Sequence, residues 1–200
     1  MAAMTNEDLL AGEDGLHRPL WASRHDDLRE YYDTEWGMPV RDERGVFERL
    51  ALEGFQSGLS WVTVLRKRPA FREAFDDFRP ATVAAFTGDD VERLMGDARL
   101  IRNRTKINAT ITNAQALLAL HASGGRLRNL LADFAPPPRA QPLLTAPVQV
   151  PESVALTRAL KARGFTFLGP VTLYATWQAI GLVDDHVAGC WLGGGAPGQP

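Results

Sequence analysis

Apolar side chains recur at helical spacing along most of this chain, and proline and glycine residues break the pattern into short runs. In residues 43–55, Val46, Leu50 and Glu53 fall at positions i, i+4 and i+7, which places them on one face of a helix. No stretch shows the period-two alternation of a half-buried strand. The pattern therefore predicts an all-α protein of about nine short helices, with no significant sheet.

The predicted helices have recognisable start and stop signals. Pro80 and Gly88 open two short helices, and Gly164 and Gly181 end the last two. Pro69 is expected to separate two helices, because a proline inside a helix removes a hydrogen bond. The remaining helices are predicted at residues 43–55, 59–68, 69–78, 104–121, 127–134, 152–163 and 169–180.

The 200 residues are enough for one domain with a sizeable core. Residues 135–150 are rich in proline and predict a non-helical connector between the central helices and the last two. We expect a single all-α domain over residues 17–191. Disordered tails are expected at residues 1–16, which are acidic, and at residues 192–200, which are rich in glycine and proline.

Bulk composition excludes several classes of protein. No apolar run reaches the ~18 residues that a membrane span needs, and the acidic start of the chain is unlike a secretory signal. Cys190 is the only cysteine, so no internal disulfide can form, and we expect a cytoplasmic protein. The net charge of -2 argues against a broadly basic nucleic-acid coat. Local clusters at residues 66–68, 99–106 and 161–163 could still bind phosphates.

Residues 52–61 read Leu-Glu-Gly-Phe-Gln-Ser-Gly-Leu-Ser-Trp and join two predicted helices through a turn that contains glycine and serine. Glu53 lies on the inward face of the first helix, where a carboxylate is costly unless a cation or hydrogen-bond donors meet it. It could cap the next helix or pair with an arginine. It could instead face a ligand beside an aromatic wall, and spacing alone leaves both possibilities open.

Five motifs in this order resemble the 3-methyladenine DNA glycosylase I family. They lie at residues 31–39, 52–61, 101–107, 164–169 and 181–186. The resemblance runs from about residue 18 to residue 190, so it covers nearly the whole chain. It implies a multi-helix, helix-hairpin-helix DNA glycosylase fold.

The resemblance also implies roles for an aromatic set and for Glu53. Tyr31 and Trp61 match positions that line the family's pocket for an extruded base, and Glu53 matches the acid of that pocket, the candidate catalytic residue. Trp21 and Trp36 are candidate base-binding residues of the same set. Large aromatic side chains dominate protein cores, so we expect Trp21 and Trp36 to be at least partly structural.

Residues 161–171 read as a helix, a short hairpin bounded by glycines, and a second helix. Two glycines alone would also fit an ordinary turn between helices. The resemblance identifies this segment as the helix-hairpin-helix element that grips the DNA backbone. It implies that backbone amides near Phe167, Leu168 and Gly169 contact phosphate, which positions the protein without reading sequence.

The sequence departs from the family at a structural zinc ion, which the family holds through four ligands. His186 and Cys190 match the C-terminal pair and, at i and i+4, are expected on one helix face. Pro19 and Tyr32 stand at the two N-terminal ligand positions, and neither supplies the missing soft ligand.

Two other histidines, His17 and His25, could substitute as ligands, but neither falls at the motif position. A structural zinc site needs four ligands in a closed tetrahedron, so we expect no metal cofactor. Packing and hydrogen bonds would then join the two ends of the chain, with Tyr32 against His186.

The resemblance implies a base-excision repair enzyme that hydrolyses the N-glycosidic bond of 3-methyladenine in alkylated double-stranded DNA. Water would be the nucleophile, and with no candidate Schiff-base lysine the enzyme is expected to be monofunctional, and also monomeric. One alternative is a non-catalytic module that binds DNA lesions through the same fold. Another is a purely helical interaction protein, against which the combination of Glu53, Tyr31 and Trp61 argues.

Overall fold

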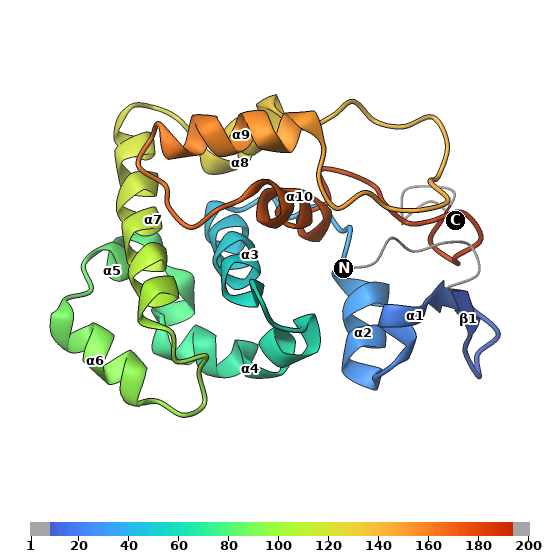
Figure 1. The fold of residues 1–200 in the computed structure, drawn as a ribbon, viewed down its shortest axis with the longest axis horizontal. Helices are drawn as coiled ribbons and strands as arrows, with labels where there is room; N and C mark the ends of the chain where they lie inside the picture. Colours follow the sequence, from blue (N-terminus) through green and yellow to red (C-terminus); the bar gives the residue numbers. More distant parts are fainter. Residues whose placement is uncertain (1–8, 194–200) are drawn as a thin grey trace.

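A computed structural model describes residues 9–193, in which ten α-helices and one two-stranded sheet confirm the all-α prediction (Figure 1). None of these helices combines the length and the apolar character that a membrane span requires. The elements in chain order are β1 Leu9–Ala11, β2 His17–Pro19, α1 Leu20–Ser23, α2 Asp26–Thr34, α3 Glu43–Gln56, α4 Trp61–Ala74, the 3-10 helix η2 Asp76–Phe78, α5 Pro80–Ala84, α6 Gly88–Gly96, α7 Arg104–Ala122, α8 Leu127–Asp133, α9 Pro151–Lys161 and α10 Pro170–Ala179.

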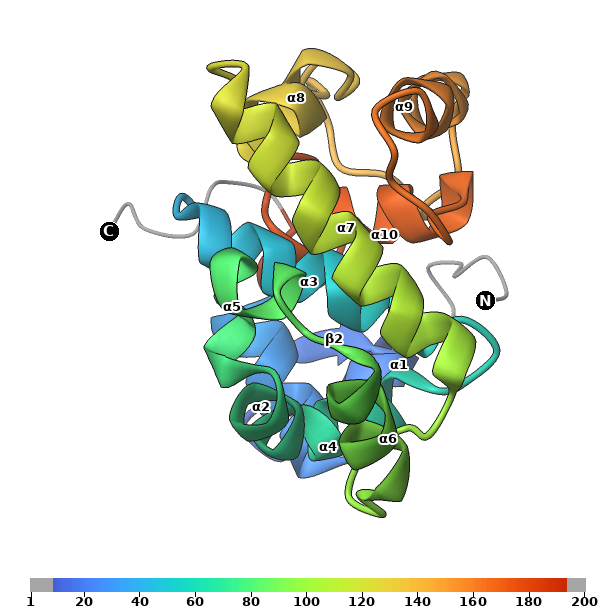
Figure 2. The same ribbon diagram turned by 90° about the vertical axis from the view of Figure 1, so that its left-hand side faces the viewer.

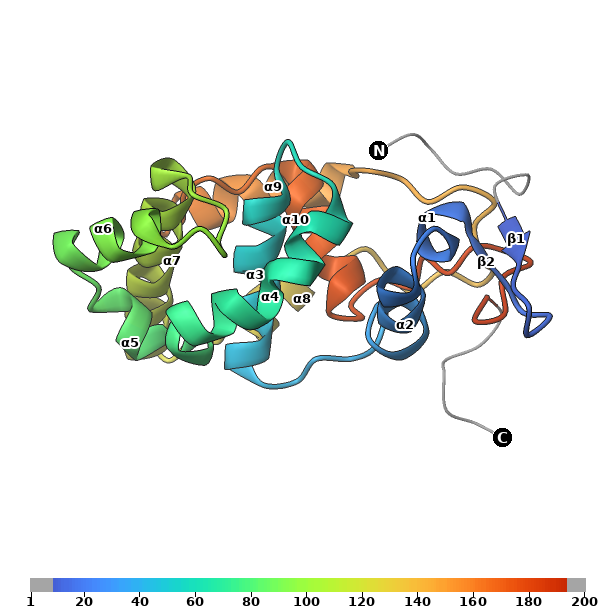
Figure 3. The same ribbon diagram turned by 90° about the horizontal axis from the view of Figure 1, so that it is seen from below.

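Helix α3 lies at the centre of the molecule and contacts α10, α4, α8 and α7 (Figures 1 and 2). The side chains on its inward positions, such as Val46, Phe47 and Leu50, are fully buried. Helices α5 and α6 pack on α7 at one end of the molecule, while α1, α2 and the sheet lie at the other end (Figure 3). Glu53 therefore sits near the C-terminal end of the most enclosed helix.

Strand β1 of the small sheet lies within residues 1–16, which the sequence predicted as a disordered tail, and β2 lies just after them. Strand β1 pairs with β2 in antiparallel register, with Leu10 opposite Arg18. Arg18 is buried and contacts Asp14 at 2.7 Å and Asp33 of α2 at 2.8 Å, which ties the hairpin to the helix. The other parts of the two predicted tails, residues 1–8 and 194–200, lie outside the described residues.

Helix α2, which carries the predicted site residue Tyr31, was not predicted from the sequence. Its buried residues Leu28, Tyr31 and Tyr32 fall at i, i+3 and i+4, and Asp26 and Asp27 occupy its first turn. An apolar stripe behind acidic residues is typical of a helix start. The signal was present but short, because the helix has only 9 residues.

Pro69 does not separate two helices, as the sequence had predicted, because α4 runs unbroken from Trp61 to Ala74. A proline inside a helix costs about 3 kcal/mol through the lost hydrogen bond and the ring clash. Contacts on both sides of Pro69 offset this cost. Arg68 and Arg72 both bind Glu48 of α3 at 2.7 Å, and Phe71 is fully buried.

Candidate functional site

The five side chains predicted for the base pocket do line one pocket, although they come from separate parts of the chain. Trp21 belongs to α1, Tyr31 to α2, Trp36 to the following turn, Glu53 to α3 and Trp61 to the start of α4. This aromatic pocket is completed by Gln56, Ala146, Ala175 and Gln178.

The rings of the aromatic pocket are arranged as walls with polar atoms between them. Tyr31 and Trp61 lie with ring centroids 5.3 Å apart at 45°, and Trp21 meets Trp36 edge-on at 5.6 Å. The Tyr31 hydroxyl and the Trp61 Nε1 are buried and have no hydrogen-bond partner within residues 9–193. Buried polar atoms are rarely left unpaired, so both are available to a ligand.

Glu53 has a side chain that is only 6% exposed. No side chain or backbone group of residues 9–193 forms a hydrogen bond with its carboxylate, so it neither caps α4 nor pairs directly with an arginine there. Burial raises its pKa from the ordinary 4.5 to about 8, and the charge of Arg49 acts in the opposite direction. In the empty pocket at neutral pH, Glu53 is therefore mostly protonated.

The aromatic pocket opens outward in two steps. Its interior holds about 60 Å³ and adjoins an outer hollow of about 300 Å³, with which it shares Glu53, Gln56, Ala175 and Gln178. The outer hollow in turn shares Ser57, Val171 and Thr172 with a groove of about 640 Å³ along the hairpin. The acid and the hairpin therefore lie along one continuous depression.

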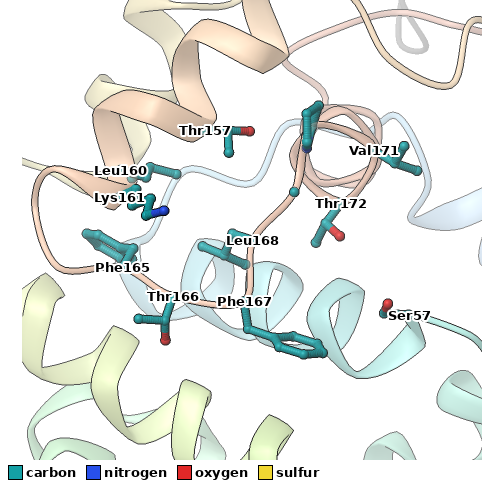
Figure 4. Close-up of a pocket in the computed structure, with 12 residues that line it drawn as sticks. Ser57, Thr157, Leu160, Lys161, Phe165, Thr166, Phe167, Leu168, Val171 and Thr172 are labelled. Carbon is teal, nitrogen blue, oxygen red and sulfur yellow. The ribbon is translucent and has the colours of Figure 1, made fainter.

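The 640 Å³ groove is called the hairpin groove below. The hairpin between α9 and α10 forms one of its walls, and Ser57 of the turn before α4 forms part of the other (Figure 4). Asn113 of α7 holds the hairpin through two bonds to the backbone of Thr166, at 2.7 and 3.2 Å. The backbone amides of the predicted contacts Phe167, Leu168 and Gly169 donate to no acceptor within the described residues. They are free to bind an anion at the start of α10.

Phe167 stands out within the hairpin. Its backbone has a φ of 58°, which is rare for a residue with a bulky side chain, and its side chain is 43% exposed. The ring extends across the groove toward Ser57 (Figure 4). Val171 and Leu59, which are also exposed, add apolar surface near the same groove.

Lys106, from the motif at residues 101–107, explains why that motif belongs to the site. Its ammonium group is buried and donates to the backbone carbonyl oxygens of Phe55, at 2.9 Å, and Ser57. A cation at a helix C-terminus binds the free carbonyls and the negative end of the dipole. Lys106 thus fixes the end of α3 and the turn into α4, a role that the sequence analysis had not assigned.

Two further residues near the pocket, Arg49 and Gln178, were not predicted from the sequence. Arg49 lies one helical turn before Glu53 on α3 and is buried. Gln178 lines the aromatic pocket and donates to the buried Asp185 at 2.8 Å. The i, i+4 spacing of Arg49 and Glu53 was visible in the sequence, but an arginine on an apolar face is normally read as solvent-exposed.

The positions of the family's zinc ligands do not fit a metal in this chain. Tyr32 donates its hydroxyl to the Cys190 Sγ at 3.0 Å, and Pro19 has no side-chain donor atom. His186 has its Nδ1 2.7 Å from the Asp184 carboxylate, which leaves only its Nε2 unpartnered among the described residues. No group of three or more His, Cys, Asp or Glu residues in residues 9–193 could hold a metal ion.

The prediction that His186 and Cys190 share a helix face was wrong, because residues 186–190 are not helical. Gly189 has a φ of 90°, and the amide of Cys190 bonds to the carbonyl of Val187 in a turn. Tyr32 still meets the His186 ring edge-on at 5.5 Å, so the expected packing is present. The hydrogen bond of Tyr32, however, goes to Cys190.

Comparisons with known proteins give one consistent result. A family model described as methyladenine glycosylase matches residues 21–193. DNA-3-methyladenine glycosylase 1 of Escherichia coli strain K12 is 44% identical over 182 residues, which cover 88% of this chain and 96% of that protein. The DNA-3-methyladenine glycosylase of Haemophilus influenzae is 41% identical over 174 residues, covering 85% and 94%.

A solved structure agrees with the sequence comparisons. The 3-methyladenine DNA glycosylase I of Staphylococcus aureus, solved to show 3-methyladenine recognition, superposes with a TM-score of 0.82. It is 32% identical, and the match covers 88% of this chain and 96% of that one. The likeness therefore extends over most of the described residues.

Proposed function

This chain belongs to the methyladenine glycosylase family, and from that premise we propose that it removes 3-methyladenine from alkylated DNA by hydrolysing the N-glycosidic bond. The observation that carries the proposal is the position of Glu53, a buried acid that has no hydrogen-bond partner among residues 9–193 and lies in an aromatic pocket that opens toward the hairpin groove. The relatives are named for this activity.

The aromatic pocket suits a cationic purine. Methylation at N3 puts a positive charge on adenine in DNA, which makes the base a good leaving group. The faces of Tyr31 and Trp61 attract a cation through their quadrupoles, at about 0.5–2 kcal/mol each. Arrival of the cation favours the ionised form of Glu53, whose carboxylate can then accept from the N–H edge of the base. A neutral base lacks the cation–π attraction and does not favour the ionised form of Glu53.

The hairpin groove suits the DNA backbone beside the extruded nucleotide. A base must leave the stack before its glycosidic bond can be reached. The free amides of Phe167, Leu168 and Gly169 lie at the helix start, where a phosphate binds well. Because the groove and the aromatic pocket are joined through the outer hollow, one strand can bind in the groove while its base enters the pocket.

We infer that water is the nucleophile and that the enzyme does not cut the strand. Strand cleavage by a glycosylase needs an amine that forms a Schiff base with the sugar. No lysine lines the aromatic pocket or the outer hollow. The ammonium group of Lys106 is bound to the backbone carbonyl oxygens of Phe55 and Ser57.

Three further properties belong to this proposal. The fold is expected to need no zinc, since Tyr32 and Cys190 form a direct hydrogen bond where the family's ligands would stand. The active form is expected to be a monomer, because one chain contains the pocket and the groove together. A cytoplasmic location agrees with the single, unpaired and buried Cys190.

A free-base release assay on methylated DNA tests the proposal. The purified protein should release 3-methyladenine, much less 7-methylguanine, and leave abasic sites without nicks. The E53Q variant controls for release by a contaminant, because it keeps the shape of the pocket and loses the acid. Binding of methylated DNA without release above background at micromolar protein would leave a non-catalytic lesion-binding module as the better description.

A further inference from the structure

An ionic network with a buried centre at Glu48, Arg49 and Arg68 lies next to the aromatic pocket. Arg49 Nη2 is 2.7 Å from Glu35, and its Nη1 is 3.3 Å from Glu48. Arg68 joins the same two carboxylates, at 2.8 Å from Glu35 and 2.7 Å from Glu48. Arg72 adds a third cation on Glu48, so the network links α3 and α4 to the turn after α2.

Arg49 differs from the other arginines of this network in its relation to Glu53. The two residues are four apart on α3, so their Cβ atoms lie about 5–6 Å apart on one helix face. The Nε of Arg49 is buried and forms no hydrogen bond within residues 9–193, although both Nη atoms are paired. The ion pairs to Glu35 and Glu48 fix the guanidinium of Arg49 in the interior, and its positive charge therefore stays near Glu53.

We propose that Arg49 is a positioning residue for base excision, whose buried charge keeps Glu53 able to ionise when a cationic base occupies the pocket. The inference rests on the proposed function. A cationic base alone would have to draw a proton from an acid in an apolar site. With Arg49 behind it, the same carboxylate is stabilised from two sides, by the resident cation and by the arriving one.

Several charged or titratable groups lie on the elements packed around Glu53. They are Tyr31 and Glu35 from α2 and its following turn, Glu48 and Arg49 from α3, Arg68 and Arg72 from α4, and Asp185 behind Gln178. Arg49 is the one whose charge opposes the effect of burial on the pKa of Glu53. Glu35 and Glu48 partly neutralise Arg49, which limits how far it can favour the ionised acid.

The pH dependence of base release tests this role. Under the proposal kcat/KM on methylated DNA rises with pH in the wild type, because the free enzyme must carry an ionised Glu53. R49M should move the midpoint upward by about one pH unit. E35Q should move it downward, because it removes an anion that shields Arg49. R49K, which keeps the charge, should restore a midpoint near the wild-type value.

R49M should fold, because both carboxylates that Arg49 binds still have another cation. Glu35 remains paired with Arg68, and Glu48 remains paired with Arg68 and Arg72. If Arg49 were purely structural, R49M would lower the melting temperature and leave the pH midpoint of kcat/KM unchanged, and that result would overturn the proposal.

A second readout needs no activity. At pH 9, R49M should lower the melting temperature more in the wild-type background than in the E53Q background. Equal losses would also overturn it. If the wild type released no base, the proposed function would fail, while this thermal comparison would still decide the role of Arg49.

Discussion

Glu53 is placed where it destabilises the empty protein. Its pKa is raised to about 8 by burial, so the folded state holds its proton more tightly than the unfolded chain, where the value is about 4.5. The stability linked to this proton is fully present below pH 4.5 and is lost as the pH rises through 8. A residue that costs stability at neutral pH is expected at a binding site, where the ligand compensates for it.

Glu53→Gln should therefore stabilise the empty protein, and the gain should depend on pH. At pH 8.5 we expect a melting temperature above that of the wild type, corresponding to as much as a few kcal/mol. At pH 4 the difference should nearly vanish, because Glu53 is then mostly protonated in both the folded and the unfolded state. Melting curves by circular dichroism across this range test the expectation. A gain that is equal at both pH values would show that the charge is not its cause.

At the scale of elements, the sequence predicted the long helices well and the short or strained ones poorly. Residues 43–55 and 104–121 have long apolar stripes and N-terminal caps, and the structure places helices there within one residue at each end. Helix α2 was missed because two turns carry little periodicity. The break at Pro69 was predicted from local chemistry, whereas the ion pairs on Glu48 that override it join distant segments.

The same reasoning applies to the candidate site. Glu53 and the aromatic set could be predicted because they stand in recognisable motifs. Arg49 and Gln178 could not, because their meaning depends on which helices pack against α3. The family resemblance implied that the hairpin amides are available to phosphate, but only the structure shows that Asn113 fixes the hairpin by binding Thr166.

Pro69→Ala tests whether α4 tolerates its proline only through tertiary contacts. Pro69 is exposed, and alanine would restore the missing amide inside an unbroken helix. We expect the free energy of unfolding to rise by about 1–2 kcal/mol, since the regained helix energy exceeds the entropy that the unfolded chain recovers. Urea denaturation would measure this. A loss of stability would instead mean that the proline sets the geometry by which Arg68 and Arg72 reach Glu48.

Gly169→Asp tests the hairpin as a phosphate site. Gly169 is the N-cap of α10, has an extended backbone, and has open space where a Cβ would lie. Aspartate is a good N-cap residue, so the fold should be unharmed. Its charge should weaken binding to duplex DNA by about tenfold, or ~1.4 kcal/mol, while binding of free 3-methyladenine is retained.

Gly169→Asn is the matched control, because it adds a side chain of the same shape and capping ability without the charge. DNA binding should then stay near the wild-type level. Fluorescence anisotropy with labelled duplex DNA would compare the three proteins. If the aspartate and asparagine variants lose DNA binding equally, bulk rather than charge is responsible, and if neither does, the hairpin is not the DNA contact.

At the scale of the whole molecule, the N-terminal and C-terminal segments meet in one junction behind the aromatic pocket. The Trp191 Nε1 donates to Asp33 at 2.9 Å, and the Trp191 amide bonds to the carbonyl of His17. The ring of Trp36 stacks on Tyr32 at 5.6 Å and meets His186 edge-on at 5.0 Å. Because Trp36 also lines the aromatic pocket, the junction supports one of its walls directly.

This junction should hold without zinc. Where metal binding drives folding, a chelator unfolds the protein, since the binding energy is folding energy. Here the Tyr32 hydroxyl donates a hydrogen bond directly to the Cys190 Sγ, and Pro19 has no side-chain atom that could bind a metal. EDTA should therefore leave the melting temperature unchanged. Elemental analysis of tag-free protein should find zinc far below one per chain. Cys190→Ser should lower the free energy of unfolding by only about 1 kcal/mol, because the serine hydroxyl can still accept the hydrogen bond from Tyr32. Stoichiometric zinc, with His17 or His25 as a further ligand, would contradict this expectation and leave the proposed base release unaffected.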